Sequence, residues 1–468
     1  MEKEEVKVID TNDKKEHGEN RCPECGASDV TWNEKKQKLV CNYCSTEFEA
    51  EQIEGIEKEA KNLVGETRTT GTKDIEENTN DMITLKCGGC GAEVVINTKE
   101  STNARCHWCH SILSINSQID NGAIPDVVLP FKLKKEEAKE KIEQFVEKRK
   151  FFANGNFRRE FTTKNIMGVY FPYLLVDANG HANFKGTGEH EVRRYTVEHK
   201  DKSETKYDVD IYDVERTFDI SIDDLTIESN LDRLNKTKKD KTNQVINAIM
   251  PFDTENCIKY KGNYLAGYSS EKRDINVKDI EEKVNKELKD VARHAINKEI
   301  KFYDRGVKWE KEELDIKGKQ WVSAYLPVWL YSYQDSKKTL HYVAVNARTG
   351  ETMGSIPMNK VKLSILSLLI FILPILLCLI LGASTGMTIG FGIFSSIAAL
   401  IYYASKSSKY MNKEARHTYE KETKHEITNV EKNDQLKQTK KGVSNSSMIG
   451  ANNKKIEGEN IKISKENK

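Results

Sequence analysis

Residues 22–44 read CPECGASDVTWNEKKQKLVCNYC, a stretch built around four cysteines. These cysteines are Cys22, Cys25, Cys41 and Cys44. They form two C-x2-C pairs separated by the 15 residues 26–40, which is enough chain for a short hairpin. Each pair can bend back in a tight knuckle, so the hairpin would bring four thiolates to about 2.3 Å from one zinc ion. The spacing therefore predicts a small β zinc ribbon over residues 21–50.

A second array with the same spacing follows 65 positions later. Its cysteines are Cys87, Cys90, Cys106 and Cys109. Residues 91–105 separate its two pairs, and Gly91-Ala92 repeats Gly26-Ala27 at the same offset. Two matched arrays favour a second ribbon over residues 83–115 and two Zn²⁺ ions in total. The alternatives are disulfides within each unit or redox-active C-x-x-C pairs, although a redox site needs only one such pair.

Neither zinc ion is expected to take part in catalysis. Four thiolates close the coordination sphere and leave no position for a reactive water. His107 and His110 flank the last cysteine pair, but the first array has no such histidines, so we expect both to be bystanders. The two remaining cysteines, Cys257 and Cys378, match no ligand pattern and are expected to be packing residues.

Residues 363–405 contain no Asp, Glu, Lys or Arg. One helix of this length would measure about 64 Å, roughly twice the hydrocarbon core of a bilayer. Two transmembrane helices within residues 363–404, joined by a turn at 382–388, therefore fit the segment better than one. A buried hairpin in a soluble core is the alternative, and such a length without a charge argues against it.

The charges beside these spans predict their orientation. Lys360 and Lys362 precede the first span, Lys406 and Lys409 follow the second, and the turn carries no charge. Because positively charged flanks stay on the cytoplasmic side, we expect both termini in the cytoplasm of a multi-pass cell-membrane protein. The N-terminus has no apolar stretch typical of a signal peptide. The cysteines would then lie in a reducing compartment, where thiolates can hold zinc.

The rest of the chain divides into one folded region and two polar segments. Residues 124–357 predict an α+β cytosolic region, in which an apolar stripe from Val277 to Ala295 indicates a helix. Residues 51–82 are polar and predict a linker. Residues 406–468 carry 15 Lys or Arg and 9 Asp or Glu with few large apolar groups, and they predict a disordered tail.

Short motifs suggest that the α+β region is duplicated internally. Tyr170-Phe-Pro172 resembles Tyr325-Leu-Pro327, and a Pro-Phe pair precedes each of them. The aromatic side chains of Trp321, Tyr325 and Trp329 could form a ligand surface, but this pattern is more typical of a sheet core. The expected fold is therefore multi-domain: two zinc ribbons, a duplicated α+β region, a transmembrane hairpin and a disordered tail.

No catalytic constellation stands out in the sequence. The segment Gly262 to Ser269 has the glycines of a phosphate loop, but Tyr268 replaces the essential lysine. Motifs of the types H-E-x-x-H, G-x-S-x-G and protein kinase are missing. Asp223-Asp224 is expected to lie in an exposed loop. We therefore expect no enzyme activity, and no small-molecule substrate is identified.

Several of these segments together resemble a known family. Residues 22–48 are similar to the zinc ribbon of transcription factor IIB, and GVYFPYLL (168–175), YLPVWLYSY (325–333) and VNARTGE (345–351) precede the membrane hairpin. This layout resembles a family of membrane-anchored zinc-ribbon proteins of Gram-positive bacteria, often labelled as primosomal or replication helicases. This chain lacks ATPase motifs. The resemblance implies a membrane platform that recruits envelope-stress proteins of the phage-shock or flotillin-associated type.

Two functions follow as expectations. The first is a membrane-anchored adaptor, whose ribbons and α+β region bind a cytosolic or membrane protein partner. The alternative is nucleic-acid binding, with phosphate contacts from the ribbons and base stacking on Trp32 or Trp108. The cations available for it are Lys35, Lys36, Lys38, Lys86, Lys99 and Arg105. Residues 406–468 have a net charge of +6 while the whole chain has +1, so the rest of the chain is net acidic, and this makes the alternative the weaker one.

Overall fold

The structure is a computed structural model that describes residues 6–11, 20–27, 29–75, 82–86, 93–97, 106–107, 118–119, 125–199, 202–229, 249–265, 268–271, 273–336, 339–382, 384–411 and 419–444. Its strands are β1 (Lys7–Ile9), β2 (Val30–Asn33), β3 (Lys38–Cys41), β4 (Glu47–Phe48), β5 (Gly65–Thr69), β6 (Met82–Lys86), β7 (Glu93–Asn97), β8 (Gln118–Ile119), β9 (Val127–Val128), β10 (Met167–His199), β11 (Lys202–Glu228), β12 (Ile258–Lys259), β13 (Ser269–Glu271), β14 (Val307–Gln334), β15 (Leu340–Asn346), β16 (Thr352–Gly354) and β17 (Lys424–Ser444). Its α-helices are α1 (Lys135–Glu147), α2 (Gly155–Glu160), α4 (Val277–Asn297), α5 (Lys360–Ile380), α6 (Thr385–Met411) and α7 (Tyr419–Glu422).

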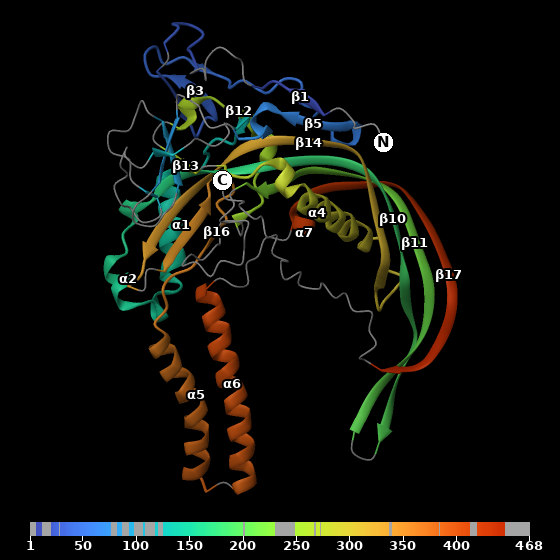
Figure 1. The fold of residues 1–468 in the computed structure, drawn as a ribbon. Helices are drawn as coiled ribbons and strands as arrows, with labels where there is room; N and C mark the ends of the chain where they lie inside the picture. Colours follow the sequence, from blue (N-terminus) through green and yellow to red (C-terminus); the bar gives the residue numbers. More distant parts are fainter. Residues whose placement is uncertain are drawn as a thin grey trace.

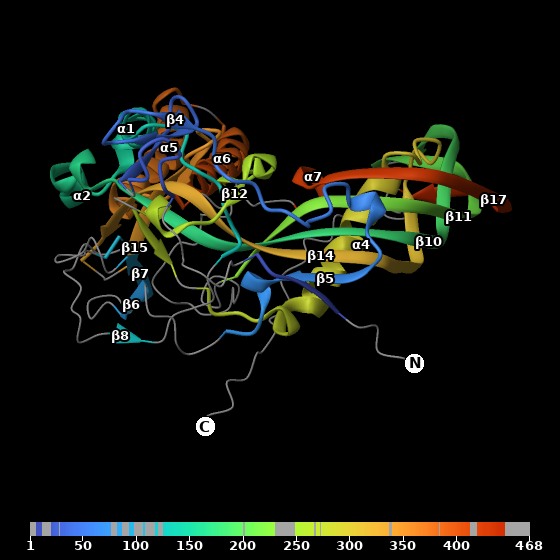
Figure 2. The ribbon, with the colours of Figure 1, turned by 90° about the horizontal axis from the view of Figure 1, so that it is seen from above.

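Within these residues, one mixed sheet of 14 strands forms the centre of the molecule, while β2, β3 and β4 form a small separate sheet. The long strands β14, β10 and β11 pair antiparallel, and β17 extends the sheet beyond β11. Figure 1 shows these four strands curving away, and Figure 2 shows them running to the far end of the molecule. We call this extension (residues 177–222, 307–319 and 424–444) the arm. The body is residues 125–176 and 321–358 with the segments packed on them.

The burial pattern of the long strands differs between the body and the arm. In the body both faces of the sheet are covered, and β14 is buried continuously over residues 321–332. In the arm one face is covered by α4, so Ala182 and Phe184 are buried while Lys185 is exposed. The side chains of α4 that pack there are Val277, Ile280, Val284, Leu288, Val291 and Ala295. This confirms the helix that the apolar stripe predicts.

Aromatic side chains of β14 belong to the sheet core. Trp321, Tyr325 and Trp329 are 0%, 2% and 5% exposed. This confirms the prediction that they belong to the sheet core, and they do not form an exposed ligand surface. The two Tyr-x-Pro motifs lie opposite each other, because Tyr170 pairs with Pro327 and Pro172 pairs with Tyr325. This register relates the two motifs by an approximate two-fold axis. The duplication of the whole region stays a prediction.

Two helices, α5 and α6, are long and apolar enough to cross a membrane. Only 11% of the apolar window of each helix is buried, and side chains such as Leu379 and Phe394 are exposed. Figure 1 shows the pair projecting together from the body. A helical hairpin buried in a soluble core does not fit this exposure, since its apolar faces would contact water.

The predicted linker over residues 51–82 is wrong for the part that the structure describes. Strand β5 runs parallel to both β1 and β14 within the main sheet. The side chain of Asp126, which is 2% exposed, accepts hydrogen bonds from the hydroxyl of Thr69 and from Gly71 N at 2.5 and 2.7 Å. Backbone pairing and one buried carboxylate hold this segment, and neither requires the apolar side chains that mark a strand in the sequence.

The predicted disorder of residues 406–468 is also wrong in part. Helix α6 continues to Met411, and β17 pairs antiparallel with β11 from Lys424 to Ser444. This strand buries few side chains, among them parts of Ile427 and Val430, so its sequence lacks a clear apolar alternation. Residues 412–418 and 445–468 lie outside the described part of the chain.

Candidate metal centre

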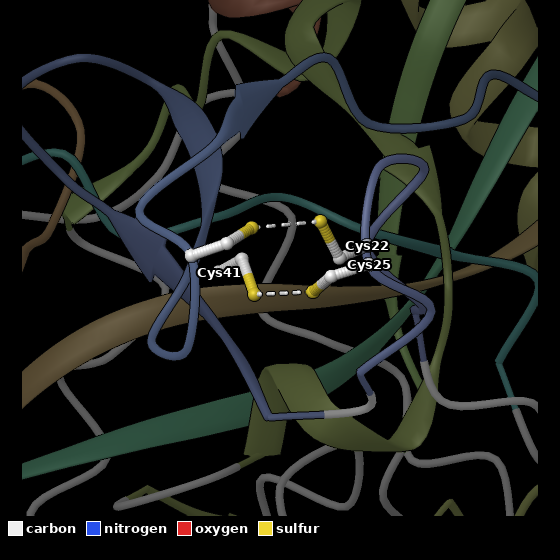
Figure 3. Close-up of side chains that lie close together, drawn as sticks. Cys22, Cys25 and Cys41 are labelled. Carbon is white, nitrogen blue, oxygen red and sulfur yellow. Dashed lines mark hydrogen bonds between the residues drawn. The ribbon is translucent and has the colours of Figure 1, made fainter.

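The four cysteines of the first array come together on the small sheet. Strands β2 and β3 form the predicted hairpin, which brings Cys41 at the end of β3 back toward the Cys22 knuckle. The sulfur of Cys22 lies 3.4 Å from that of Cys44, and the sulfur of Cys25 lies 3.6 Å from that of Cys41. Figure 3 shows the side chains of Cys22, Cys25 and Cys41 pointing toward one another.

These distances match a single tetrahedral ion. Four sulfurs at about 2.3 Å from a zinc ion would lie roughly 3.8 Å apart, and all four sulfurs here lie within 4.8 Å of one another. Among the described residues, no histidine or carboxylate joins this group. The geometry is therefore that of a closed four-thiolate site, compatible with a metal ion such as zinc.

Both knuckles use the same local backbone. Gly26 N donates to Cys22 O at 2.9 Å, and Ser45 N donates to Cys41 O at 2.9 Å. Gly26 and Ser45, each following the second cysteine of its pair, have φ angles of +73° and +63°. The turn thus needs the left-handed region, which glycine adopts without cost and serine less readily.

One cysteine is prepared to ionise before a metal arrives. The hydroxyl of Thr46 lies 3.1 Å from the sulfur of Cys44. This side-chain hydrogen bond, together with the backbone N–H of Thr46, lowers the pKa of Cys44 to about 6. A thiolate is the form that binds metal, so these hydrogen bonds favour the ligating form of Cys44.

The ribbon is docked on the body. The indole N–H of Trp32 donates to Phe131 O at 2.9 Å, and the ring packs against Tyr264 with centroids 6.1 Å apart. The hydroxyl of Tyr268 donates to Glu34 at 3.1 Å. Trp32 therefore contacts the body although its ring is only partly buried, and base stacking on it stays a prediction.

The predicted phosphate-binding lysines of this ribbon are partly engaged as well. Lys36 forms an ion pair with Glu47, and Lys38 forms one with Glu49 at 2.8 Å. Two acidic neighbours reduce the positive potential of the hairpin, which weakens its attraction for a nucleic-acid backbone.

The second array is described only around Cys106. Both Cys106 and His107 are fully buried, and Cys106 joins the apolar cluster that contains Phe171. His107 Nε2 lies 3.2 Å from Glu271 Oε1, and the hydroxyl of Ser269 lies 3.3 Å from His107 Nδ1. Cys87, Cys90, Cys109 and His110 lie outside the described residues, so a second zinc site stays a prediction. Strands β6 and β7 of this unit pair antiparallel with each other, and β7 also pairs with β13, so both strands belong to the main sheet.

The remaining cysteines behave as packing residues. Cys257 packs against the apolar cluster of the body, and burial raises the pKa of its thiol well above the usual value. Cys378 is 9% exposed within α5.

The structure also brings together three aspartates that the sequence does not connect. The prediction that Asp223-Asp224 lies in an exposed loop is wrong: both residues belong to β11 and are partly buried. A β-bulge sets these two residues opposite Asp177 of β10, and Asp224 has a φ angle of +52°. The carboxylate oxygens of the three residues lie within 4.8 Å of one another. The signal available in the sequence was a pair of charges inside an otherwise alternating strand, ISIDDLTI (220–227).

Burial favours the protonated form of the carboxyl groups in this cluster. Burial, with the charge of Asp224, raises the pKa of Asp177 to about 8, and burial raises the pKa of Asp224 to about 6. Asp177 accepts hydrogen bonds from Asp224 N at 2.7 Å and from Gln320 at 3.2 Å. The cluster borders an open cleft of about 230 Å³ that Asp253, Glu255 and Lys424 also line. Among the described residues, this is a charged cleft without a recognisable catalytic arrangement.

No protein-family model, curated protein or solved structure matches this chain.

Proposed function

We propose that this chain is a membrane-anchored zinc adaptor, which holds a protein partner at the cytoplasmic surface of the cell membrane. The observation that carries the proposal is the combination of a closed four-thiolate site with two exposed apolar helices. A closed site offers no position for substrate, so its contribution is a rigid surface. The helices supply the anchor, and a second zinc ion in the Cys87 array would stabilise the body.

The outward tip of the second knuckle is the surface we expect a partner to contact. Tyr43 lies between Cys41 and Cys44 and is 82% exposed, while the opposite side of the ribbon is occupied by the body. Exposed tyrosines are frequent anchors at protein interfaces, because a large side chain loses little conformational freedom on binding. A knuckle locked by metal presents this side chain without further ordering.

The test is partner recruitment in cells that carry the full chain. A cytosolic protein should become enriched in the membrane fraction and crosslink near Tyr43 when the chain is present. Tyr43→Ala should reduce this enrichment, while Phe302→Ala, which removes a 53% exposed ring from the loop before β14 on the arm, should not. Equal enrichment with and without the chain would refute the adaptor function. Nuclease-sensitive recruitment would favour the nucleic-acid alternative instead.

A further inference from the structure

A short basic segment meets the membrane helices where they join the body. Residues 148–164 carry six basic side chains and one acidic one, in a chain whose net charge is +1. The basic residues are Lys148, Arg149, Lys150, Arg158, Arg159 and Lys164. All of them except Arg149 are exposed. The segment, which we call the basic shoulder, includes α2 and the 3₁₀ turn Lys150–Phe152.

Hydrogen bonds fix the basic shoulder to both membrane helices. Phe152 N donates to the hydroxyl of Tyr410 in α6 at 2.9 Å, and Lys362 Nζ in α5 donates to Phe151 O at 2.9 Å. Asn359, which caps α5, donates its N–H to Phe152 O at 2.7 Å. Because Lys362 lies in the first turn of α5 and Tyr410 in the last turn of α6, the shoulder lies at the depth where both helices leave the bilayer.

The side chains at this depth have the composition of a membrane interface. Phe151 is 59% exposed, and the ammonium group of Lys362 lies 3.7 Å from the centre of its ring. On α6, the ammonium group of Lys406 lies 5.6 Å from the ring centre of Tyr402. Aromatic rings with neighbouring lysines are typical of the headgroup region, where the ring meets the apolar boundary and the ammonium group stays hydrated.

We propose that the basic shoulder rests on the membrane surface and binds the phosphates of anionic phospholipids, with Phe151 at the headgroup boundary. The cations are distributed over 17 residues and five of them are exposed, with Lys150 paired to the exposed Glu147 at 3.1 Å. This spread suits a layer of many headgroups better than one enclosed phosphate. This inference rests on the membrane anchoring in the proposed function and adds the lipid class that the anchor requires. In this proposal the basic shoulder binds lipid, whereas Tyr43 contacts the protein partner.

The test compares the full chain in two kinds of nanodisc by hydrogen exchange. One kind contains only phosphatidylcholine, and the other contains about 30% phosphatidylglycerol, which adds a negative surface potential. Exchange in residues 148–164 should be roughly fivefold slower in the anionic nanodiscs. Replacing four exposed cations of the shoulder should remove the difference: Lys148→Gln, Lys150→Gln, Arg158→Gln and Arg159→Gln.

The matched control removes four exposed lysines from the arm, so that the net charge changes equally. It carries Lys308→Gln, Lys432→Gln, Lys440→Gln and Lys441→Gln. This control should keep the lipid-dependent slowing. Three outcomes would each overturn the proposal. The first is equal exchange of residues 148–164 in both kinds of nanodisc, and the second is loss of the slowing in the control variant as well. The third is slower exchange in neutral nanodiscs when inorganic phosphate is added. Release of the native chain from cell membranes by alkaline carbonate would instead refute the anchoring itself, so the two failures can be told apart.

Discussion

Arg348 Nη2 lies 2.8 Å from Asp253 Oδ2, and this ion pair joins segments almost one hundred residues apart in the chain. The side chain of Arg348 is 3% exposed. Its guanidinium also donates to Pro130 O at 3.1 Å and to the side chain of Gln37 in the ribbon hairpin. One planar cation with several fixed donors thus connects the four-cysteine ribbon, the Pro-Phe segment and the loop before β12.

Arg348→Met should destabilise the protein strongly. It keeps much of the side-chain volume but leaves Asp253 without its ion-pair partner and removes the donor to Pro130 O. Breaking such a buried pair should lower the free energy of unfolding by about 3 kcal/mol. Urea denaturation of the detergent-solubilised chain, followed by tryptophan fluorescence, measures the change. Arg348→Lys should recover part of the loss, and an unchanged midpoint for Arg348→Met would contradict the role of the pair.

Zinc content should respond to single ligand substitutions. We expect two equivalents of zinc per purified chain and one fewer in Cys41→Ser, because three thiolates no longer close the first site. Elemental analysis by mass spectrometry gives the number directly. Cys257→Ser is the control, since this thiol packs against the apolar cluster and should leave the zinc content unchanged. One equivalent in the wild-type chain would refute the predicted second site.

Stability should rise as the pH falls from about 8 toward 6, through the Asp177 cluster. Burial raises the pKa of Asp177 to about 8, above the unfolded value of about 3.9. The folded state therefore binds more protons between these values, and the stabilisation is lost as the pH rises through 8. Asp177→Asn should raise the melting temperature near pH 8 and flatten its pH dependence. Asp315→Asn, at an exposed position of β14, should leave the pH profile as it is.

Removal of residues 424–468 should loosen the arm without unfolding the body. Arg216, which is 3% exposed, would lose its ion pair with Asp434, and β11 would become a free edge. Hydrogen exchange should become faster in β11, while the core of β10, β14 and α4 stays protected. Faster exchange throughout α4 would show that β17 is required for the whole fold. The variant Asp434→Asn, which keeps the strand, should produce a smaller effect confined to the neighbourhood of Arg216.

Local patterns in the sequence were enough to predict the first four-cysteine site and the two helices that are apolar enough to span a membrane. The four ligands Cys22 to Cys44 lie within 23 residues, so their spacing and the turn residues between them contain the geometry. The uncharged run 363–405 is likewise a property of one continuous segment. In both cases the physical requirement, thiolates around one ion or apolar side chains in lipid, acts on neighbours in the chain.

Long-range pairing accounts for what the sequence did not reveal. The polar segments that hold β5 and β17 enter the sheet through backbone hydrogen bonds to β14 and β11, which leave little trace in side-chain pattern. The contact of Trp32 with Phe131 O and the meeting of Asp177 with Asp224 likewise join residues 99 and 47 positions apart. Cysteine spacing and hydropathy therefore determine where this protein can hold a metal ion and which of its helices are apolar enough to span a membrane. Which surfaces stay accessible depends on how the distant strands pack, because burial is a property of the whole assembled sheet.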